Sequence, residues 1–156
     1  MEILIRKASV CDAEEINKCL KLAFKEYEKE ACESAAKGAL SESVETTAED
    51  ISAKLFLVAE LDGKIIGSVR VLVEDNCGYL SRFSVLPEYH KYGTGKLLLD
   101  KVDDYMLKMS VLSIYLHTCI DVEHLVSFYR KNGFEVESVS TERGYNRAKL
   151  VKKYGE

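Results

Sequence analysis

The sequence predicts an α/β protein with a mixed, mostly antiparallel sheet flanked by helices, in one domain that spans residues 1–156. Two observations predict this class. Strand patterns on either side of a two-residue turn occupy the middle of the chain, and strand and helix patterns alternate in its second half. The length is typical of one domain, and the contents of 47% hydrophobic and 31% charged residues are ordinary for a globular fold.

The first third of the chain predicts a strand followed by helices. The segment EILIRKA has a strand pattern, and Asp12 with Glu15 forms a capping-box pattern that predicts a helix start. The next apolar residues lie at helical spacing and form one stripe: Ile16, Cys19, Leu20, Ala23, Phe24 and Tyr27. Residues 28–45 are polar and small, so we expect helical order there with weak tertiary anchoring, as a mobile cover. Thr47 and Asp50 are candidates to open another short helix.

The rest of the chain predicts three strands and then alternating helices and strands. KLFLVAEL and KIIGSVRVLVE flank Asp62-Gly63, a two-residue hairpin signal because both positions can take positive φ. EDNCG predicts the next turn, and YLSRFSV predicts a third strand. A helix from Gly93 to about Met109 follows, then strand VLSIYLHT, helix EHLVSFYRKN ending at Gly133, and strands FEVESVS and RAKLVKKY.

Composition argues against several classes of function and location. The net charge of −4 gives no global basic field, so we expect no nucleic-acid partner. The five cysteines show no C-x-x-C spacing, which favours a reducing cytoplasm. No segment has a signal-peptide core or the ~20 apolar residues of a membrane span, so we expect neither export nor insertion. His90, His117 and His124 show no ligand spacing with the cysteines, so we expect no metal site.

The stretch HKYGTGK, from His90 to Lys96, places two glycines between a strand and a helix. A P-loop requires wider glycine spacing, and a dinucleotide fingerprint requires a third glycine where Leu98 stands, so both are excluded. A helix start remains, whose unpaired amides at Gly93 and Gly95 are open to close approach by a phosphate or pyrophosphate. Two small residues that serve only packing are the alternative interpretation.

The stretch VLPEYHKYGTGKLL, followed later by LVSFYRKNGFEVE, resembles the two motifs of the GNAT superfamily of N-acetyltransferases. The residues in register with these motifs are Val85, Pro87, Gly93, Gly95, Phe128, Tyr129, Gly133 and Phe134. The predicted order of elements also resembles that fold from end to end. The resemblance implies a GNAT fold with a sheet splayed at a cofactor cleft, and acetyl-CoA as the acyl donor.

The resemblance also implies which residues bind this donor. Its pyrophosphate would lie on the amides of Lys91 to Lys96, and its pantetheine arm would run beside the strand that contains Phe83 and Val85. The N–H of Val85 would polarise the thioester carbonyl. The cofactor-binding residues expected from this resemblance are Phe83, Ser84, Val85, His90, Lys91, Tyr92, Gly93, Thr94, Gly95 and Lys96.

Two residues are candidates for the catalytic proton transfers. In the FYRKNGF context, the resemblance implies that Tyr129 is the general acid that protonates the departing thiolate. Tyr79 stands where some members carry a glutamate base, so the base is open. His117 ends a strand beside the expected cleft and is a candidate base, with Glu74 and Asp75 as alternatives.

These features predict direct transfer of an acetyl group from acetyl-CoA to a primary amine of a small molecule or, as a second class of acceptor, a protein or peptide. A non-catalytic acyl-CoA sensor or scaffold is the alternative function. The acidic residues within 28–45 would suit a cationic acceptor, and a solvated helix face explains them equally well. The C-terminal TERGYNRAKLVKKY indicates a half-exposed strand. For an oligomer, a homodimer is the first expectation.

Overall fold

The structure is a computed structural model, and it describes residues 2–155. Its strands are β1 (Leu4–Lys7), β2 (Leu55–Leu61), β3 (Lys64–Glu74), β4 (Cys77–Val85), β5 (Ser113–Cys119), β6 (Glu135–Ser140) and β7 (Arg147–Lys153). Its helices are α1 (Ala13–Glu30), α2 (Glu33–Leu40), α3 (Val44–Ala53), α4 (Thr94–Lys108) and α5 (Glu123–Lys131), with 3₁₀ turns η1 (Val10–Asp12) and η2 (Pro87–Tyr92).

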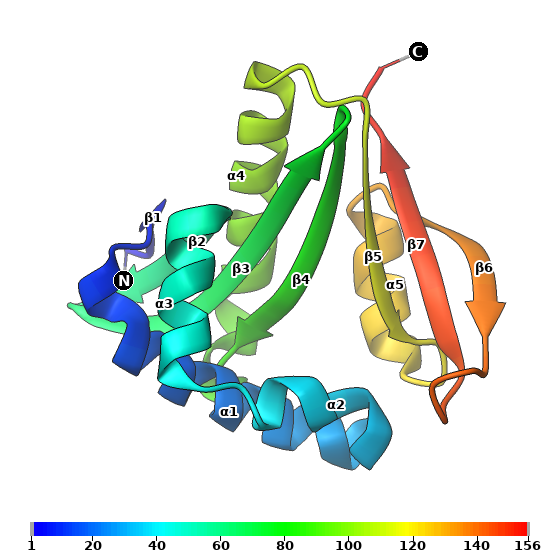
Figure 1. Ribbon diagram of the computed structural model, residues 1–156, viewed down its shortest axis with the longest axis horizontal. Helices are drawn as coiled ribbons and strands as arrows, with labels where there is room; N and C mark the ends of the chain where they lie inside the picture. The colour runs from blue at the N-terminus through cyan, green and yellow to red at the C-terminus, as the bar shows by residue number, and fades with distance from the viewer. Residues whose placement is uncertain (1, 156) are drawn as a thin grey trace.

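The seven strands form one mixed sheet in the order β1-β2-β3-β4-β5-β7-β6. Strands β4 and β5 pair in parallel, and the other neighbouring pairs are antiparallel. Helices α1, α2 and α3 lie over one face of the sheet, while α4 and α5 lie over the other (Figure 1). The predicted fold class is therefore confirmed, including the parallel crossover beside an antiparallel first half.

Local sequence signals explain most of these elements. Ile16, Cys19 and Leu20 of the predicted helical stripe are buried against the sheet. The turn between β2 and β3 has positive φ at both Asp62 (50°) and Gly63 (78°), as the hairpin signal requires. Burial of the apolar faces of α1 and α4 against β2, β3 and β4 then forms the core that fixes the site.

The start of α1 is correctly predicted, but the capping box is not. The carboxylate of Asp12 accepts the N–H of Ser9 at 2.8 Å and pairs with Arg6 at 2.8 Å, so it stabilises the preceding 3₁₀ turn. The carboxylate of Glu15 accepts the N–H of Ile65 at 2.8 Å, across to β3. Both carboxylates therefore bind backbone N–H groups or an arginine outside the first turn of α1. These contacts compete with the local helix cap and replace it.

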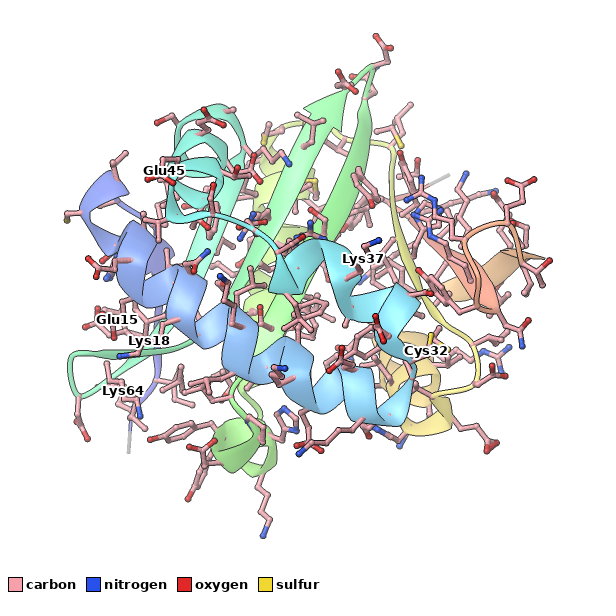
Figure 2. All side chains as sticks on the ribbon, turned by 60° about the horizontal axis from the view of Figure 1, so that its bottom comes forward. Glu15, Lys18, Cys32, Lys37, Glu45 and Lys64 are labelled. Carbon is pink, nitrogen blue, oxygen red and sulfur yellow. The ribbon has the colours of Figure 1, made fainter. Side chains whose placement is uncertain are left out.

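The expectation of weak tertiary anchoring in residues 28–45 is wrong, while the mobility of this cover stays a prediction. Helix α2 buries Ala36 and Ala39, whose small side chains allow the helix to pack closely, and α1 and α2 cross the sheet together (Figure 2). Glu42, which follows α2, is buried and accepts hydrogen bonds from Arg70 at 2.7 Å and from Arg82 at 3.1 Å. Burial raises the pKa of Glu42, but the hydrogen bonds from Arg70, Thr47 and Arg82 and the charge of Arg70 together outweigh it and hold the pKa below its usual value.

Helix α3 begins earlier than Thr47 and Asp50, which were candidates to open it. The hydroxyl of Ser43 accepts the N–H of Thr46 at 3.1 Å and caps the helix. Asp50 lies inside α3 and pairs with the buried Arg70 at 2.8 Å. The signals at Thr47 and Asp50 therefore mark tertiary contacts of this helix rather than its start.

Residues 2–155 contain neither a helix suited to span a membrane nor a cluster of metal ligands. None of the helices in this range combines the length and the apolar character needed to cross a bilayer. No group of three or more His, Cys, Asp or Glu side chains in the same range is arranged to hold a metal ion.

Candidate active site

A cleft of about 500 Å³ opens where β4 and β5 separate. The two strands pair only from Cys77 to Tyr79 and from Ser113 to Tyr115. Further along β4 the register with β3 shifts, and Arg82 takes a positive φ of 52°, which marks a bulge. The bulge bends β4 at the level where it leaves β5, so backbone groups of both strands are freed to face the cleft.

One end of the cleft is the start of α4. Gly93 has a φ of 73° with nothing within 4 Å of a Cβ placed on it. The N–H of Leu97 donates to the Gly93 carbonyl at 3.0 Å as the first bond of the helix, so the three preceding amides lack partners within it. A Cβ on Gly95 would lie 3.1 Å from both Phe83 and Phe128. The open glycine and the unpaired amides fit a pyrophosphate approaching the backbone.

Most of the expected cofactor-binding residues line this cleft. Those that do so are Phe83, Ser84, Val85, His90, Gly93, Gly95 and Lys96. The side chains of Lys91, Tyr92 and Thr94 do not line it. Tyr92 is 51% exposed, and the hydroxyl of Thr94 donates to the Tyr89 carbonyl at 3.1 Å. The backbone groups of these three residues, at and just before the start of α4, are the parts that lie next to the cleft.

The backbone of Val85 faces the cleft. The N–H of Leu86 donates to the Ile66 carbonyl at 2.9 Å, so by the alternation of a strand the Val85 N–H points away from β3. The carbonyl of Val85 is 2.9 Å from Nε2 of His90. A carbonyl only accepts, so this His90 nitrogen carries the proton. His90 thereby fixes the orientation of the chain that presents the Val85 N–H.

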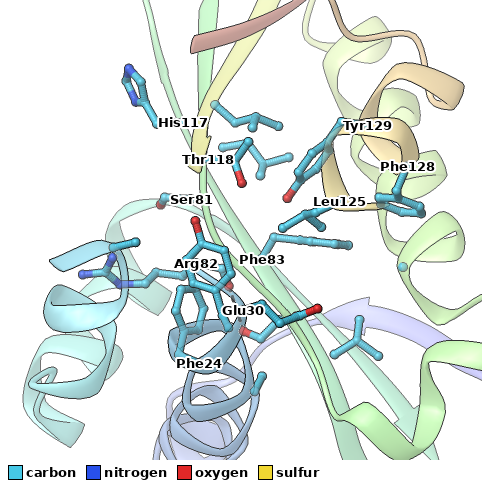
Figure 3. A pocket seen from close by; sticks show the side chains of 18 of the residues that line it. Phe24, Glu30, Ser81, Arg82, Phe83, His117, Thr118, Leu125, Phe128 and Tyr129 are labelled. Carbon is cyan, nitrogen blue, oxygen red and sulfur yellow. Dashed lines mark hydrogen bonds between the residues drawn. The ribbon is translucent and has the colours of Figure 1, made fainter. Parts of the chain in front are cut away.

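Tyr129 lies on α5 at the opposite wall of the cleft. Its ring packs 6.0 Å from Phe83, 5.6 Å from Phe128 and 5.8 Å from Phe134, measured between centroids. The side chain is 4% exposed, and burial raises the pKa of its hydroxyl well above the usual value. Figure 3 shows this hydroxyl pointing into the cleft from α5. It is therefore a protonated donor at neutral and moderately alkaline pH.

His117 lies on β5 at the other side of the cleft from Phe128 (Figure 3). Burial, followed by the positive charges of Arg147, Lys149 and Arg143, lowers the pKa of its imidazole to about 4. Its Nδ1 is buried without a hydrogen-bond partner in the described chain. The ring is therefore neutral at physiological pH, and the side chain lines the cleft.

We expect an NMR titration of His117 to show a midpoint near pH 4, and Arg147→Gln to move that midpoint upward toward the ordinary value. Because the pKa lies below the unfolded value of about 6.5, the unfolded chain binds more protons between these limits. Stability should therefore fall as pH drops from about 6.5 to 4. A midpoint near 6.5 in the folded wild type would contradict the charge arrangement around this ring.

The structure separates the alternative bases from the cleft and adds residues that the sequence did not indicate. Glu74 and Asp75 lie at the turn between β3 and β4 and do not line the cleft. Arg143, Tyr145 and Arg147, from the β6–β7 loop and the start of β7, do line it. The only sequence signal for these three was basic character in a segment that indicated a half-exposed strand.

Comparisons with known proteins agree with the two motifs. The profile of the acetyltransferase (GNAT) family matches residues 17–134. A PaiA N-acetyltransferase from Thermoplasma acidophilum, solved in complex with coenzyme A, superimposes with a TM-score of 0.87 at 30% identity over 99% of this chain and 100% of that one. A GNAT-family acetyltransferase from Streptococcus pneumoniae, at 22% identity and a TM-score of 0.82 over 99% of this chain and 100% of that one, supports the fold alone.

A curated relative covers a shorter region. A spermidine N(1)-acetyltransferase from Thermoplasma acidophilum is 38% identical over 85 residues, which is 53% of this chain and 52% of that protein. The aligned part thus spans about half the length of this relative. The family profile covers most of the chain, however, and the fold superimposes over nearly its full length on an acetyltransferase of 30% identity. The chain therefore belongs to the GNAT family of acetyltransferases, enzymes whose acyl donor is acetyl-CoA.

Proposed function

We propose that the protein transfers an acetyl group from acetyl-CoA directly to a primary amine of a small molecule. The observation that carries this proposal is one cleft in which three donors converge: the unpaired amides at the start of α4, the backbone N–H of Val85 and the hydroxyl of Tyr129. The name of the spermidine N(1)-acetyltransferase supports a small amine as the class of acceptor. The continuous sheet supports treating residues 1–156 as one domain.

Each donor has a distinct part in the proposed reaction. When bound, acetyl-CoA supplies a thioester that is already activated toward amines. The α4 amides and the dipole of that helix hold the pyrophosphate. The N–H of Val85 donates to the thioester oxygen as negative charge develops there, and Tyr129 donates its proton to the departing sulfur. The C–N bond forms as the C–S bond breaks, and the proton of the amine leaves to a base or to water.

His117 is the proposed base, acting directly or through a water molecule. Its low pKa, due first to burial and then to the neighbouring cations, keeps the imidazole neutral above about pH 5, so that one ring nitrogen can accept a proton. The acceptor must also be a neutral amine, so kcat/KM should rise with pH as that amine loses its proton. With His117 neutral throughout, the acid limb of this profile should follow the pKa of the amine chosen.

Direct transfer agrees with the state of the thiol in the cleft region. Cys119 is the last residue of β5, and burial raises the pKa of its thiol above the usual value. A protonated, buried thiol is a poor nucleophile, so an acetyl-cysteine enzyme is disfavoured. The five free cysteines of the chain also support the proposal that the protein works in a reducing compartment such as the cytoplasm.

The test is an acetyl-transfer assay with a panel of small primary amines, in which CoA release and the mass of the acetylated amine are both measured. We expect mass gain that requires both protein and acetyl-CoA. Tight binding of acetyl-CoA without transfer to any amine would instead support the acyl-CoA sensor or scaffold. Absence of acetyl-CoA binding by calorimetry would overturn both functions.

A further inference from the structure

The cleft has a second, cationic end that the donor does not explain. Arg147 begins β7 opposite Cys119, and Arg143 lies in the preceding loop; both line the cleft beside His117. In the same sheet Lys149 pairs in register with His117. Burial first, and then the positive charges of Arg147, Lys149 and Arg143, lower the pKa of His117, in keeping with their place at this end of the cleft.

The two arginines at this end carry charge that the protein does not neutralise. Within residues 2–155 neither Arg143 nor Arg147 forms an ion pair, whereas Lys149 pairs with Glu137 at 3.1 Å. Of the carboxylates that line the cleft, Glu30 contacts His124, and Glu26 lies 4.0 Å from the exposed Lys29. The guanidinium groups of Arg143 and Arg147 have no carboxylate partner within residues 2–155, and their natural ligand is an anion.

This cationic end is separated from the start of α4 by an aromatic layer. Phe83 and Phe128 stack with centroids 5.9 Å apart, and both contact the position of Gly95. His117 packs instead near Tyr79 and Tyr115, with ring centroids 5.8 Å away in each case. Figure 3 shows His117 and Phe128 on opposite sides of Phe83. An anion at the arginines would thus belong to the acceptor rather than to the pyrophosphate of the donor.

We infer that the acceptor is a primary amine that also carries a carboxylate, and that Arg147 and Arg143 bind this carboxylate. The inference rests on the proposed function. Guanidinium groups bind carboxylates in a bidentate manner, which would orient the amine toward the Val85 N–H and Tyr129. A polycation such as spermidine would instead place its extra charge against these arginines.

The structure accounts for part of the acidic character that suggested a cationic acceptor. That expectation rested on the acidic residues within 28–45 of the sequence. Glu42 is buried and paired with Arg70 and Arg82, and Glu30 is paired with His124. Glu42 is therefore not available to attract an ammonium group, and the carboxylate of Glu30 already has a hydrogen-bond partner.

The first arm of the test measures binding. His117 is titrated by NMR with β-alanine, and then with β-alaninamide, which has the same amine but no carboxylate. We expect β-alanine to raise the His117 pKa in the wild type, because a bound anion favours the imidazolium ion, and β-alaninamide not to do so. Arg147→Gln should abolish the effect. Arg130→Gln removes an exposed arginine of α5 outside the cleft and should preserve it.

The second arm measures turnover with ω-amino acids of increasing length, each beside its primary amide, and with spermidine. We expect kcat/KM to favour the carboxylate by about tenfold or more in each active pair, and Arg147→Gln to reduce that ratio to about one. If the amides or spermidine gave the same kcat/KM as the carboxylates, the inference would be overturned and the proposed function would stay intact. A large loss of acetyl-CoA affinity in Arg147→Gln would also overturn the inference, because it would assign this residue to the donor.

The two arms separate the possible failures. If no amine is acetylated although acetyl-CoA binds, the proposed function fails, and the titration still decides whether the arginines bind a carboxylate. If the His117 pKa fails to respond to any ω-amino acid of the series, the carboxylate subsite is wrong whatever the enzyme acetylates.

Discussion

Replacing Gly93 by glutamate should weaken the binding of acetyl-CoA by about 100-fold while the protein remains folded. A Cβ at this position meets nothing within 4 Å, so the new side chain creates no clash in the free protein. It does place a carboxylate at the start of α4, where the unpaired amides are proposed to hold the pyrophosphate. Repulsion between like charges a few ångströms apart accounts for a loss of this size.

The chain offers a matched control for this variant in Gly63→Glu. Gly63 has a φ of 78°, close to the 73° of Gly93, and it is equally open, but it lies in the β2–β3 turn outside the cleft. Both variants carry the same strain of about 1 kcal/mol and the same added charge. Calorimetry with acetyl-CoA and desulfo-CoA should therefore show loss of binding only for Gly93→Glu. Equal affinity of the two variants would mean that the phosphates bind elsewhere.

The sequence was sufficient to predict this end of the site because its signals are local. A strand pattern, a glycine pair and a helical pattern follow one another within about twenty residues, and the first amides of a helix lack partners in any protein. The positive φ of Gly93 likewise follows from its position directly before α4. The helix that carries Tyr129 and its stop at Gly133 are likewise local signals, whereas the role of Tyr129 came from the resemblance to the GNAT motifs.

The other end of the site could not be predicted, because charged residues look alike in a sequence whether they are solvated or buried. In the sequence, Glu42 has the character of the other acidic residues within 28–45, which a solvated helix face explains. In the structure it is buried and paired with Arg70 of β3. Arg82 lies within the strand pattern YLSRFSV, but the bulge gives it a positive φ, and it pairs with Glu42. Burial of such ion pairs depends on tertiary approach, which no local pattern records.

The cationic end depends on strand pairing in the same way. Arg147 is 30 residues from His117 in the sequence, and the two meet only because β5 and β7 pair antiparallel. The basic character of the C-terminal segment was visible, but its alternation indicated only one exposed face. The separation of β4 from β5 opens the cleft beside this face of the strand and so determines which ligand can bind there. That separation is a property of the assembled sheet.

Replacing Tyr129 by phenylalanine should lower kcat by about 100-fold and change the Kd for acetyl-CoA by less than about threefold. The ring contacts with Phe83, Phe128 and Phe134 are retained, so the wall of the cleft is preserved. Within residues 2–155 the hydroxyl makes no hydrogen bond that its removal would break, so the thermal stability should change little. What is lost is the proton proposed for the departing sulfur.

The control is Tyr154→Phe, which removes another largely buried hydroxyl. Tyr154 donates to Asp103 at 2.6 Å outside the cleft, so this variant should lose stability and keep its kcat, the reverse of Tyr129→Phe. Burial raises the pKa of Tyr129, so its hydroxyl stays protonated up to about pH 10. The kcat of the wild type should therefore show no decrease from loss of this proton at any pH up to about 10. A kcat within about threefold of the wild type in Tyr129→Phe, with chemistry limiting, would assign the proton to water and leave Tyr129 a packing residue.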